Sequence, residues 1–168
     1  MDTPKRKPNR LPDFDYSTPG AYFITICVAG KQCLLANIVG GGALDAPQVH
    51  LTKAGEIAEK YILSGNRIPQ IQVEKFVIMP NHIHLLLAVN KEEANGSSKA
   101  PTPTNAIVPH FVSNFKRFCH RDIGTHIFQR SYHDHIIRGE QDYLKIWEYI
   151  DNNPARWKED CFYLEEVQ

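Results

Sequence analysis

The sequence predicts one α+β domain, with an antiparallel sheet and helices packed on it in a ferredoxin-like sandwich. The chain has 168 residues and is 42% hydrophobic, which is enough for a single buried core. Segments with strand and helix patterns follow one another in the order β-β-α-β-β-α-β-α, which favours this architecture. The sequence contains no internal repeat, so we treat residues 1–168 as one domain.

The first half of the chain supplies two strand patterns and one helix pattern. Residues 21–30, AYFITICVAG, are rich in aromatic and β-branched side chains and end in glycine, which indicates a strand and a turn. Residues 32–39 form a plausible second strand that leads into three glycines. Residues 49–65 open with a short extended piece. A helix then begins at Thr52, a suitable N-cap, and stops at Gly65.

A hairpin is the clearest pattern in the middle of the chain. The apolar runs 71–79 and 82–89 meet at Pro80 and Asn81. Proline presets the backbone of a tight turn and asparagine tolerates unusual backbone angles there. We therefore expect two antiparallel strands that are joined directly.

The last third of the chain alternates loop, helix, extended segment and helix. Residues 90–105 are polar and contain Gly, Ser and Pro, so they predict a mobile loop. Residues 106–124 have helical spacing, and residues 126–139 look extended and irregular. Residues 139–154 predict a helix that Pro154 terminates.

Composition excludes some classes of protein. Lys and Arg total 19 and Asp and Glu total 19, so the overall charge gives no argument for nucleic acid or a membrane surface. No apolar run is long enough to span a membrane, and no apolar signal-peptide core follows the basic start. Four cysteines without a CxxC pair argue against a thiolate zinc site. We expect a cytoplasmic protein with reduced thiols.

Two histidines at the start of the second hairpin strand are candidate metal ligands. Side chains alternate between the faces of a strand, so His82 and His84 share one face and Ile83 lies on the other. Residues two apart on a strand are roughly 7 Å apart, which lets two neutral imidazoles converge on one cation. The alternative is a structural pair. His133 and His135 alternate in the same way around Asp134 and are a second candidate.

The last predicted helix carries an unusual tyrosine. Its core-facing stripe contains Ile146 and Ile150, whereas Tyr149 lies on a neighbouring ridge with Lys145 and Asn153. Tyr149 either covers the rim of the core or serves as a nucleophile. Because a phenol has a pKa of about 10, it suits reactions in which a metal polarises the electrophile, such as strand transfer on nucleic acid.

Five segments in order resemble a known family. The sequence PNHIHLLL (80–87) resembles the His-hydrophobe-His motif of the HUH single-strand DNA endonucleases. Over about residues 9–158 the chain is similar to the single-tyrosine insertion-sequence transposases, and most of all to the REP-associated tyrosine transposases. The similar segments are PGAYFITICV (19–28), VEKFVIMPNHIHLLLAV (73–89), FKR (115–117), FQRSYHDHIIRGEQDY (128–143) and EYIDNNPARW (148–157).

This resemblance implies a site and a reaction. His82 and His84 match the two metal-binding histidines, and Asn153 falls where the family places a third, polar ligand. Tyr149 matches the nucleophile that forms a 5′-phosphotyrosine link and frees a 3′-hydroxyl. The implied cofactor is a divalent ion, Mg²⁺ or Mn²⁺, and the implied partner is single-stranded or hairpin DNA at the nucleoid. The family includes monomers and homodimers that exchange the C-terminal helix.

Contacts to DNA and the competing functions stay open at this point. Basic residues of the second predicted helix and of the flexible tail 1–10 could hold phosphates, or could simply be solvated. They are Lys116, Arg117 and Arg121, with Lys5, Arg6, Lys7 and Arg10. The alternatives to a strand transferase are a domesticated DNA-binding protein, a metal-dependent nuclease that uses water, and an RNA-binding ferredoxin-like domain with a structural histidine pair.

Overall fold

The structure is a computed structural model that describes residues 14, 16, 18–40, 46–90 and 107–163. The tail 1–10, with its four basic residues, lies outside the described residues, and so does the predicted loop 90–105 beyond Asn90. Over the described ranges, no helix is long and apolar enough to cross a membrane.

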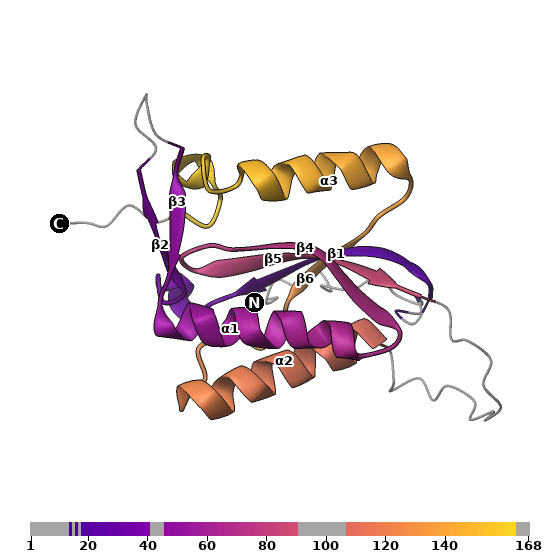
Figure 1. Cartoon of the computed structure of the whole chain (residues 1–168), viewed down its shortest axis with the longest axis horizontal. Coiled ribbons are helices and arrows are strands. Elements are labelled where there is room, and N and C mark those ends of the chain that lie inside the picture. Colours follow the sequence, from indigo (N-terminus) through magenta and orange to yellow (C-terminus); the bar gives the residue numbers. More distant parts are fainter. Residues whose placement is uncertain (1–13, 15, 17, 41–45, 91–106, 164–168) are drawn as a thin grey trace, which may run out of the picture.

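The chain folds as the predicted α+β sandwich. Four antiparallel strands form the main sheet in the order β4-β5-β1-β6. Helices α1 and α2 lie against one face of this sheet, and α3 lies against the other (Figure 1). The elements are β1 (Gly20–Cys27), β2 (Ala36–Val39), β3 (Gln48–Leu51), α1 (Lys53–Ser64), β4 (Ile71–Ile78), β5 (His82–Val89), α2 (Ile107–Ile123), β6 (His133–Ile136) and α3 (Glu140–Asn152).

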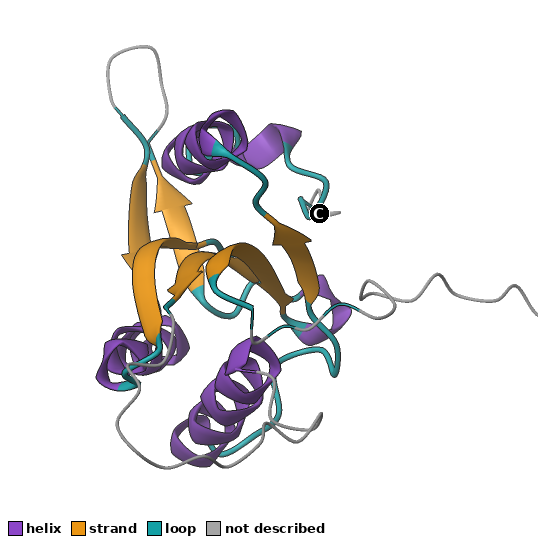
Figure 2. Cartoon of the chain, turned by 90° about the vertical axis from the view of Figure 1, so that its right-hand side faces the viewer, coloured by secondary structure: helices purple, strands orange, loops and turns teal. Residues whose placement is uncertain are grey.

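The expectation for residues 32–39 is wrong in its extent. The strand there, β2, covers the last four of these residues and pairs with β3 in a separate two-stranded sheet (Figure 2). The chain leaves the main sheet after β1 because Gly30 and Lys31 adopt positive φ angles of 64° and 55°. That turn directs the following residues away from β1, so the second strand needs a different partner.

Helix α1 begins where the sequence predicts. The side chain of Thr52 accepts a hydrogen bond from the backbone N–H of Gly55 at 3.2 Å, which satisfies one free donor of the first turn. Gly55 is required by packing, because a Cβ atom there would lie 2.0 Å from the carbonyl oxygen of Leu35. The helix start is therefore pressed directly onto the backbone before β2.

Strand β5 separates two cores. Ile83, Leu85 and Leu87 are fully buried in the larger core, on the side of α1 and α2. Leu86 faces the other way and packs with Ile146 of α3. This alternation confirms the predicted two-faced strand. The face toward α3 is the one that also carries the histidines.

Helix α3 is fastened to its own sheet by polar contacts as well as by its apolar stripe. The phenol of Tyr143 donates a hydrogen bond to Glu74, and Lys75 forms a 2.6 Å ion pair with Asp151. The Lys75 ammonium also lies 4.0 Å from the centre of the Trp147 ring. A β-bulge between Val73 and Lys75 interrupts the regular register of β4 next to these contacts. The tyrosine helix is thus seated over β4 and β5 of the same chain.

Candidate active site

The two histidines open β5, immediately after the hairpin turn. Their side chains are 0% and 2% exposed, and both lie on the sheet face that α3 covers. Strand β1 runs beside them, with Cys27 opposite His82 and Thr25 opposite His84. Ile83, Leu85 and Leu87 of the same strand lie in the larger core, on the other face of the sheet. The predicted placement of both histidines on one face is confirmed.

Their ring nitrogens converge. Nε2 of His82 lies 3.0 Å from Nε2 of His84. On the opposite side of each ring, Nδ1 of His82 lies 2.9 Å from Oδ1 of Asn81, and Nδ1 of His84 lies 2.9 Å from the hydroxyl of Thr25. Each imidazole is therefore held from behind by one polar side chain and presents Nε2 to a common centre.

Asn81 fixes the tautomer of His82. The Asn81 side chain is buried, and its Nδ2 donates to the carbonyl oxygens of Lys31 at 3.1 Å and Phe162 at 2.8 Å. Its Oδ1 must then be the atom that faces His82, so it accepts the Nδ1–H of that ring. His82 is left with a lone pair on Nε2. The Thr25 hydroxyl can donate or accept, so it is compatible with either tautomer of His84.

Burial keeps both rings neutral. It lowers the pKa of His82 to about 4, although the nearby Asp160 carboxylate opposes this shift. Burial, with the proximity of His82, also lowers the pKa of His84 well below its usual value. At neutral pH both imidazoles are in the form that binds metal ions.

A carboxylate that sequence reasoning missed completes a set of three donors. Oδ2 of Asp160 lies 3.8 Å from Nε2 of His82, and the donor atoms of His82, His84 and Asp160 all lie within 4.8 Å of one another. Asp160 comes from the turn after the 3₁₀ helix Trp157–Glu159, and its Oδ1 accepts the backbone N–H of Phe162. No local spacing links this single acid to the histidines, so the sequence offered no signal for it.

Asn153 lies beside Asp160 and supplies a fourth polar group. It is 3% exposed, and its Nδ2 donates to Oδ2 of Asp160 at 3.1 Å. Within the described part of the chain, its Oδ1 is buried without a hydrogen-bond partner. Two converging neutral imidazoles, one carboxylate and one unsatisfied amide oxygen are a donor set that fits a divalent cation.

Tyr149 reaches this centre from α3. Its phenolic oxygen lies 3.3 Å from Nε2 of His84, while the residue remains 41% exposed. Phe23 of β1 stacks on His84 and meets the Tyr149 ring edge-on, which holds both rings in place. Burial, together with the Asp160 carboxylate, raises the pKa of Tyr149 to about 12. The phenol is therefore protonated at neutral pH, and a nearby cation would favour its ionisation.

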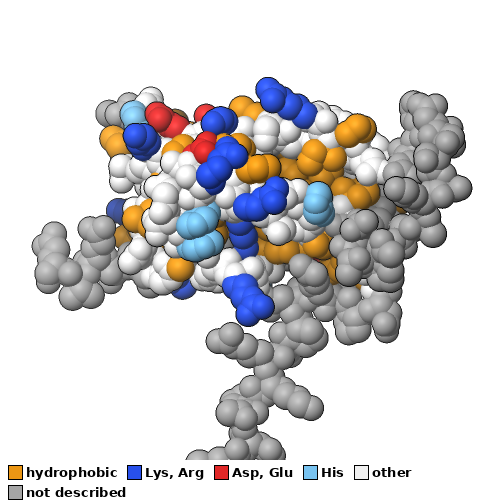
Figure 3. All heavy atoms as spheres, turned by 90° about the horizontal axis from the view of Figure 1, so that it is seen from below, with side chains coloured by type: hydrophobic (Ala, Val, Ile, Leu, Met, Phe, Trp, Pro, Cys, Tyr) orange, Lys and Arg blue, Asp and Glu red, His pale blue; other side chains and the backbone are white. Residues whose placement is uncertain are grey.

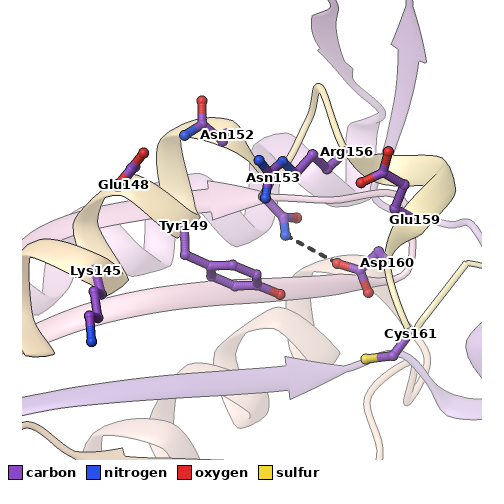
Figure 4. Close-up of a pocket in the computed structure, with 9 residues that line it drawn as sticks. All are labelled: Lys145, Glu148, Tyr149, Asn152, Asn153, Arg156, Glu159, Asp160 and Cys161. Atoms are coloured by element: carbon purple, nitrogen blue, oxygen red, sulfur yellow. Dashed lines mark hydrogen bonds between the residues drawn. The ribbon is translucent and has the colours of Figure 1, made fainter.

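A cavity of about 480 Å³ opens beside Tyr149. In Figure 4 the phenolic oxygen points beneath Asn153 toward Asp160, and Lys145 extends from the preceding turn of α3. The lining residues are Lys145, Glu148, Tyr149, Asn152, Asn153, Arg156, Glu159, Asp160 and Cys161. Tyr149 thus faces both the histidine centre and an open space that can receive a substrate.

The helix cations predicted to contact DNA lie on the opposite side of the sheet, on α2. Lys116 donates to the carbonyl oxygens of Gln129 and Ser131, both at 2.8 Å, and burial lowers its pKa to about 8. Arg121 donates to the hydroxyl of Tyr61, and Arg117 lies over the ring of Phe118 at 5.0 Å. Basic side chains and histidines are spread over this face (Figure 3). The structure does not bring these cations to Tyr149.

The second histidine candidate gains no third ligand in the described ranges. His133 and His135 lie on β6, and Nε2 of His135 is 2.8 Å from Oδ2 of Asp142. Among the residues that the structure describes, one group of three metal-binding side chains is close enough to share an ion, and it is the group with His82 and His84.

Comparisons with known proteins agree with this fold. No family model matches the chain. An uncharacterised protein of Haemophilus influenzae is 31% identical over 95% of this chain and 94% of its own length. The solved structure of a REP-associated tyrosine transposase bound to a REP hairpin superposes with a TM-score of 0.57. The superposition covers 83% of this chain and 68% of the transposase at 19% identity.

Proposed function

The chain belongs to one family with the Haemophilus influenzae protein and has the fold of a REP-associated tyrosine transposase, and from this premise we propose that it cuts and rejoins single-stranded DNA. The proposed enzyme is a metal-dependent endonuclease and strand transferase with Tyr149 as nucleophile. His82, His84 and Asn153 are the proposed metal-binding residues, and we add Asp160 to them. The observation that carries the proposal is the 3.3 Å approach of the Tyr149 oxygen to His84.

The bound ion, Mg²⁺ or Mn²⁺, would supply Lewis-acid chemistry at the scissile phosphate. The Tyr149 oxygen attacks phosphorus in line, the bond from phosphorus to the 3′-oxygen breaks, and a 5′-phosphotyrosine forms. The phenolic proton leaves to solvent in the cavity, and the departing 3′-oxygen takes up a proton. Because the phosphotyrosine keeps the energy of the phosphodiester, a 3′-hydroxyl can reverse the attack and rejoin the strand without ATP.

The open cavity beside Tyr149 supports a polymeric substrate rather than a small enclosed one. The structural neighbour is bound to a REP hairpin, and we propose hairpin-forming single-stranded DNA as the partner of this chain. The proposed protein is a single cytoplasmic, nucleoid-associated domain with a basic tail at 1–10 and a loop at 90–105. Because α3 is seated on its own sheet, one chain can assemble the site, whether the protein is a monomer or a homodimer.

A covalent-trapping assay tests the proposal. Purified protein with Mn²⁺ or Mg²⁺ is mixed with labelled single-stranded hairpins from the DNA that flanks its own gene, and products are separated on a denaturing gel. We expect a metal-dependent protein–DNA adduct that Tyr149→Phe and His82→Ala abolish. Tyr163→Phe, which removes a phenol outside the cavity, is the matched control and should retain the adduct.

Two other results would select the competing functions. Cutting that yields no adduct and survives Tyr149→Phe would identify a nuclease that uses water. Tight binding of the hairpin without cutting would identify a domesticated DNA-binding protein.

A further inference from the structure

We propose that Lys145 and Arg156 bind the backbone phosphates on either side of the phosphate that Tyr149 attacks, so that the DNA strand runs along α3. This inference rests on the proposed function and specifies how the substrate lies in the same site. It also predicts that the DNA strand binds in the cavity only when the divalent ion is present.

The two cations and the nucleophile lie on one ridge. Residues four apart on a helix share a face, and the rise of 1.5 Å per residue separates Lys145 from Tyr149 by about 6 Å along the axis. Arg156 follows the end of α3, but its backbone N–H still donates to the carbonyl oxygen of Asn152 at 3.1 Å, an i to i−4 bond that continues the helical turn. Lys145, Tyr149 and Arg156 line the same cavity (Figure 4).

Both cations are available to a ligand. Lys145 and Arg156 are exposed, and neither side chain makes an ion pair or a hydrogen bond with another residue that the structure describes. Two other cations of the chain, by contrast, already have partners. Lys116 is bonded to backbone carbonyls, and Lys75 is paired with Asp151. A phosphate is therefore a natural partner for the two cations that flank Tyr149.

The acidic residues of the cavity make this binding depend on the ion. Three carboxylates, those of Glu148, Glu159 and Asp160, line the cavity against two cations. Without a divalent ion the cavity is net negative and repels a phosphate chain. A divalent cation held beside Asp160 reverses the net charge to positive. The DNA strand should then bind in the cavity only when the ion is present, before any cutting occurs.

Salt-dependent binding tests the inference. Fluorescence anisotropy of a labelled single-stranded oligonucleotide is measured in the Tyr149→Phe background, which cannot form the adduct, with Mn²⁺ and with EDTA. The logarithm of the association constant falls linearly with the logarithm of the salt concentration. For a single strand, removing one phosphate contact reduces the magnitude of this negative slope by about 0.7. We expect this loss for Lys145→Gln and for Arg156→Gln, and weak binding in EDTA. The matched control is Lys158→Gln, an exposed cation of the 3₁₀ helix that does not line the cavity.

The outcomes separate this inference from the proposed function. If Lys145→Gln and Arg156→Gln have the same salt slope as Lys158→Gln, then Lys145 and Arg156 do not bind the backbone phosphates. This result would overturn the inference even if the protein with Tyr149 intact forms the adduct. Equal affinity with Mn²⁺ and with EDTA would overturn the dependence on the ion. If the slopes of Lys145→Gln and Arg156→Gln are reduced but the unmodified protein forms no adduct, the phosphate contacts are supported and the strand-transferase function is rejected. Because both substituted side chains are exposed, the variants should fold, and thermal melting checks this.

Discussion

The phenolic oxygen of Tyr149 lies 3.3 Å from Nε2 of His84, although the two residues are 65 positions apart in the chain. The contact exists because α3 packs across the face of β5 that carries the histidines, while Lys75 and Glu74 hold the same helix to β4. Nucleophile and metal-ligand candidates are thus assembled within one chain.

Asp160 should contribute directly to metal binding. Its Oδ2 lies 3.8 Å from Nε2 of His82, so Asp160→Asn replaces a charged oxygen donor in the group by a neutral one. We expect Mn²⁺ affinity, measured by calorimetry or electron paramagnetic resonance, to fall by at least about tenfold. Glu159→Gln removes a neighbouring exposed carboxylate and should leave the affinity nearly unchanged. Equal losses in the two variants would mean that general cavity charge, and not a ligand, is responsible.

Asn81 should act as a positioning residue for His82. Asn81→Ala removes the acceptor of the Nδ1–H and two bonds to the carbonyl oxygens of Lys31 and Phe162. Outer hydrogen-bond partners of ligating histidines are typically worth about 10- to 100-fold in metal affinity, and we expect a loss in this range. The ¹⁵N spectrum of the metal-free protein should also show His82 as a mixture of tautomers.

The control for Asn81 is Asn37→Ala, an exposed asparagine on β2. It should change neither the metal affinity nor the His82 spectrum. An unchanged His82 tautomer in Asn81→Ala would contradict the positioning role.

The stability of the metal-free protein should fall on acidification because of His82. Burial lowers its folded-state pKa to about 4 from 6.5, so the unfolded state binds more protons between these two values. Stability is therefore complete above about pH 6.5 and decreases as the pH falls toward 4, with a total loss of about 3 kcal/mol. Burial also lowers the pKa of His84, so His84 contributes to stability with the same dependence on pH.

Urea unfolding between pH 4 and 7 in EDTA measures this dependence. His82→Gln should flatten it, whereas His50→Gln, which changes an exposed histidine of β3, should leave it intact. A pH dependence that persists in His82→Gln and His84→Gln would show that other groups cause it.

Gly55→Ala should destabilise the fold although it improves helix propensity. In an isolated helix alanine is better than glycine by about 1 kcal/mol. Here the new Cβ would lie 2.0 Å from the carbonyl oxygen of Leu35, and overpacking of this kind typically costs about 1 to 3 kcal/mol. Thermal unfolding should therefore show a lower midpoint, with Glu56→Ala on the same helix as the control. A higher midpoint for Gly55→Ala would mean that the backbone before β2 yields easily.

Local patterns were sufficient for most of the secondary structure. The Thr52 cap, the hairpin at Asn81 and the end of the last helix before Pro154 are each encoded within a few residues, and the structure places all three as expected. The pairing of β2 was not predictable in this way. It depends on the turn at Gly30, whose positive φ sends the chain out of the main sheet.

The sequence by itself determined which side chains could perform the chemistry, because the alternation of a strand puts His82 and His84 on one face and helical spacing keeps Tyr149 out of the core stripe. Tertiary structure alone decided which groups meet. It brought Asp160 from a turn beyond α3 to the two imidazoles, engaged Lys116 and Arg121 on the far side of the sheet, and left Lys145 and Arg156 exposed in the cavity beside the nucleophile. The reason is physical: periodicity fixes the direction of a side chain relative to its own element, whereas the distance between elements is set by how their faces pack.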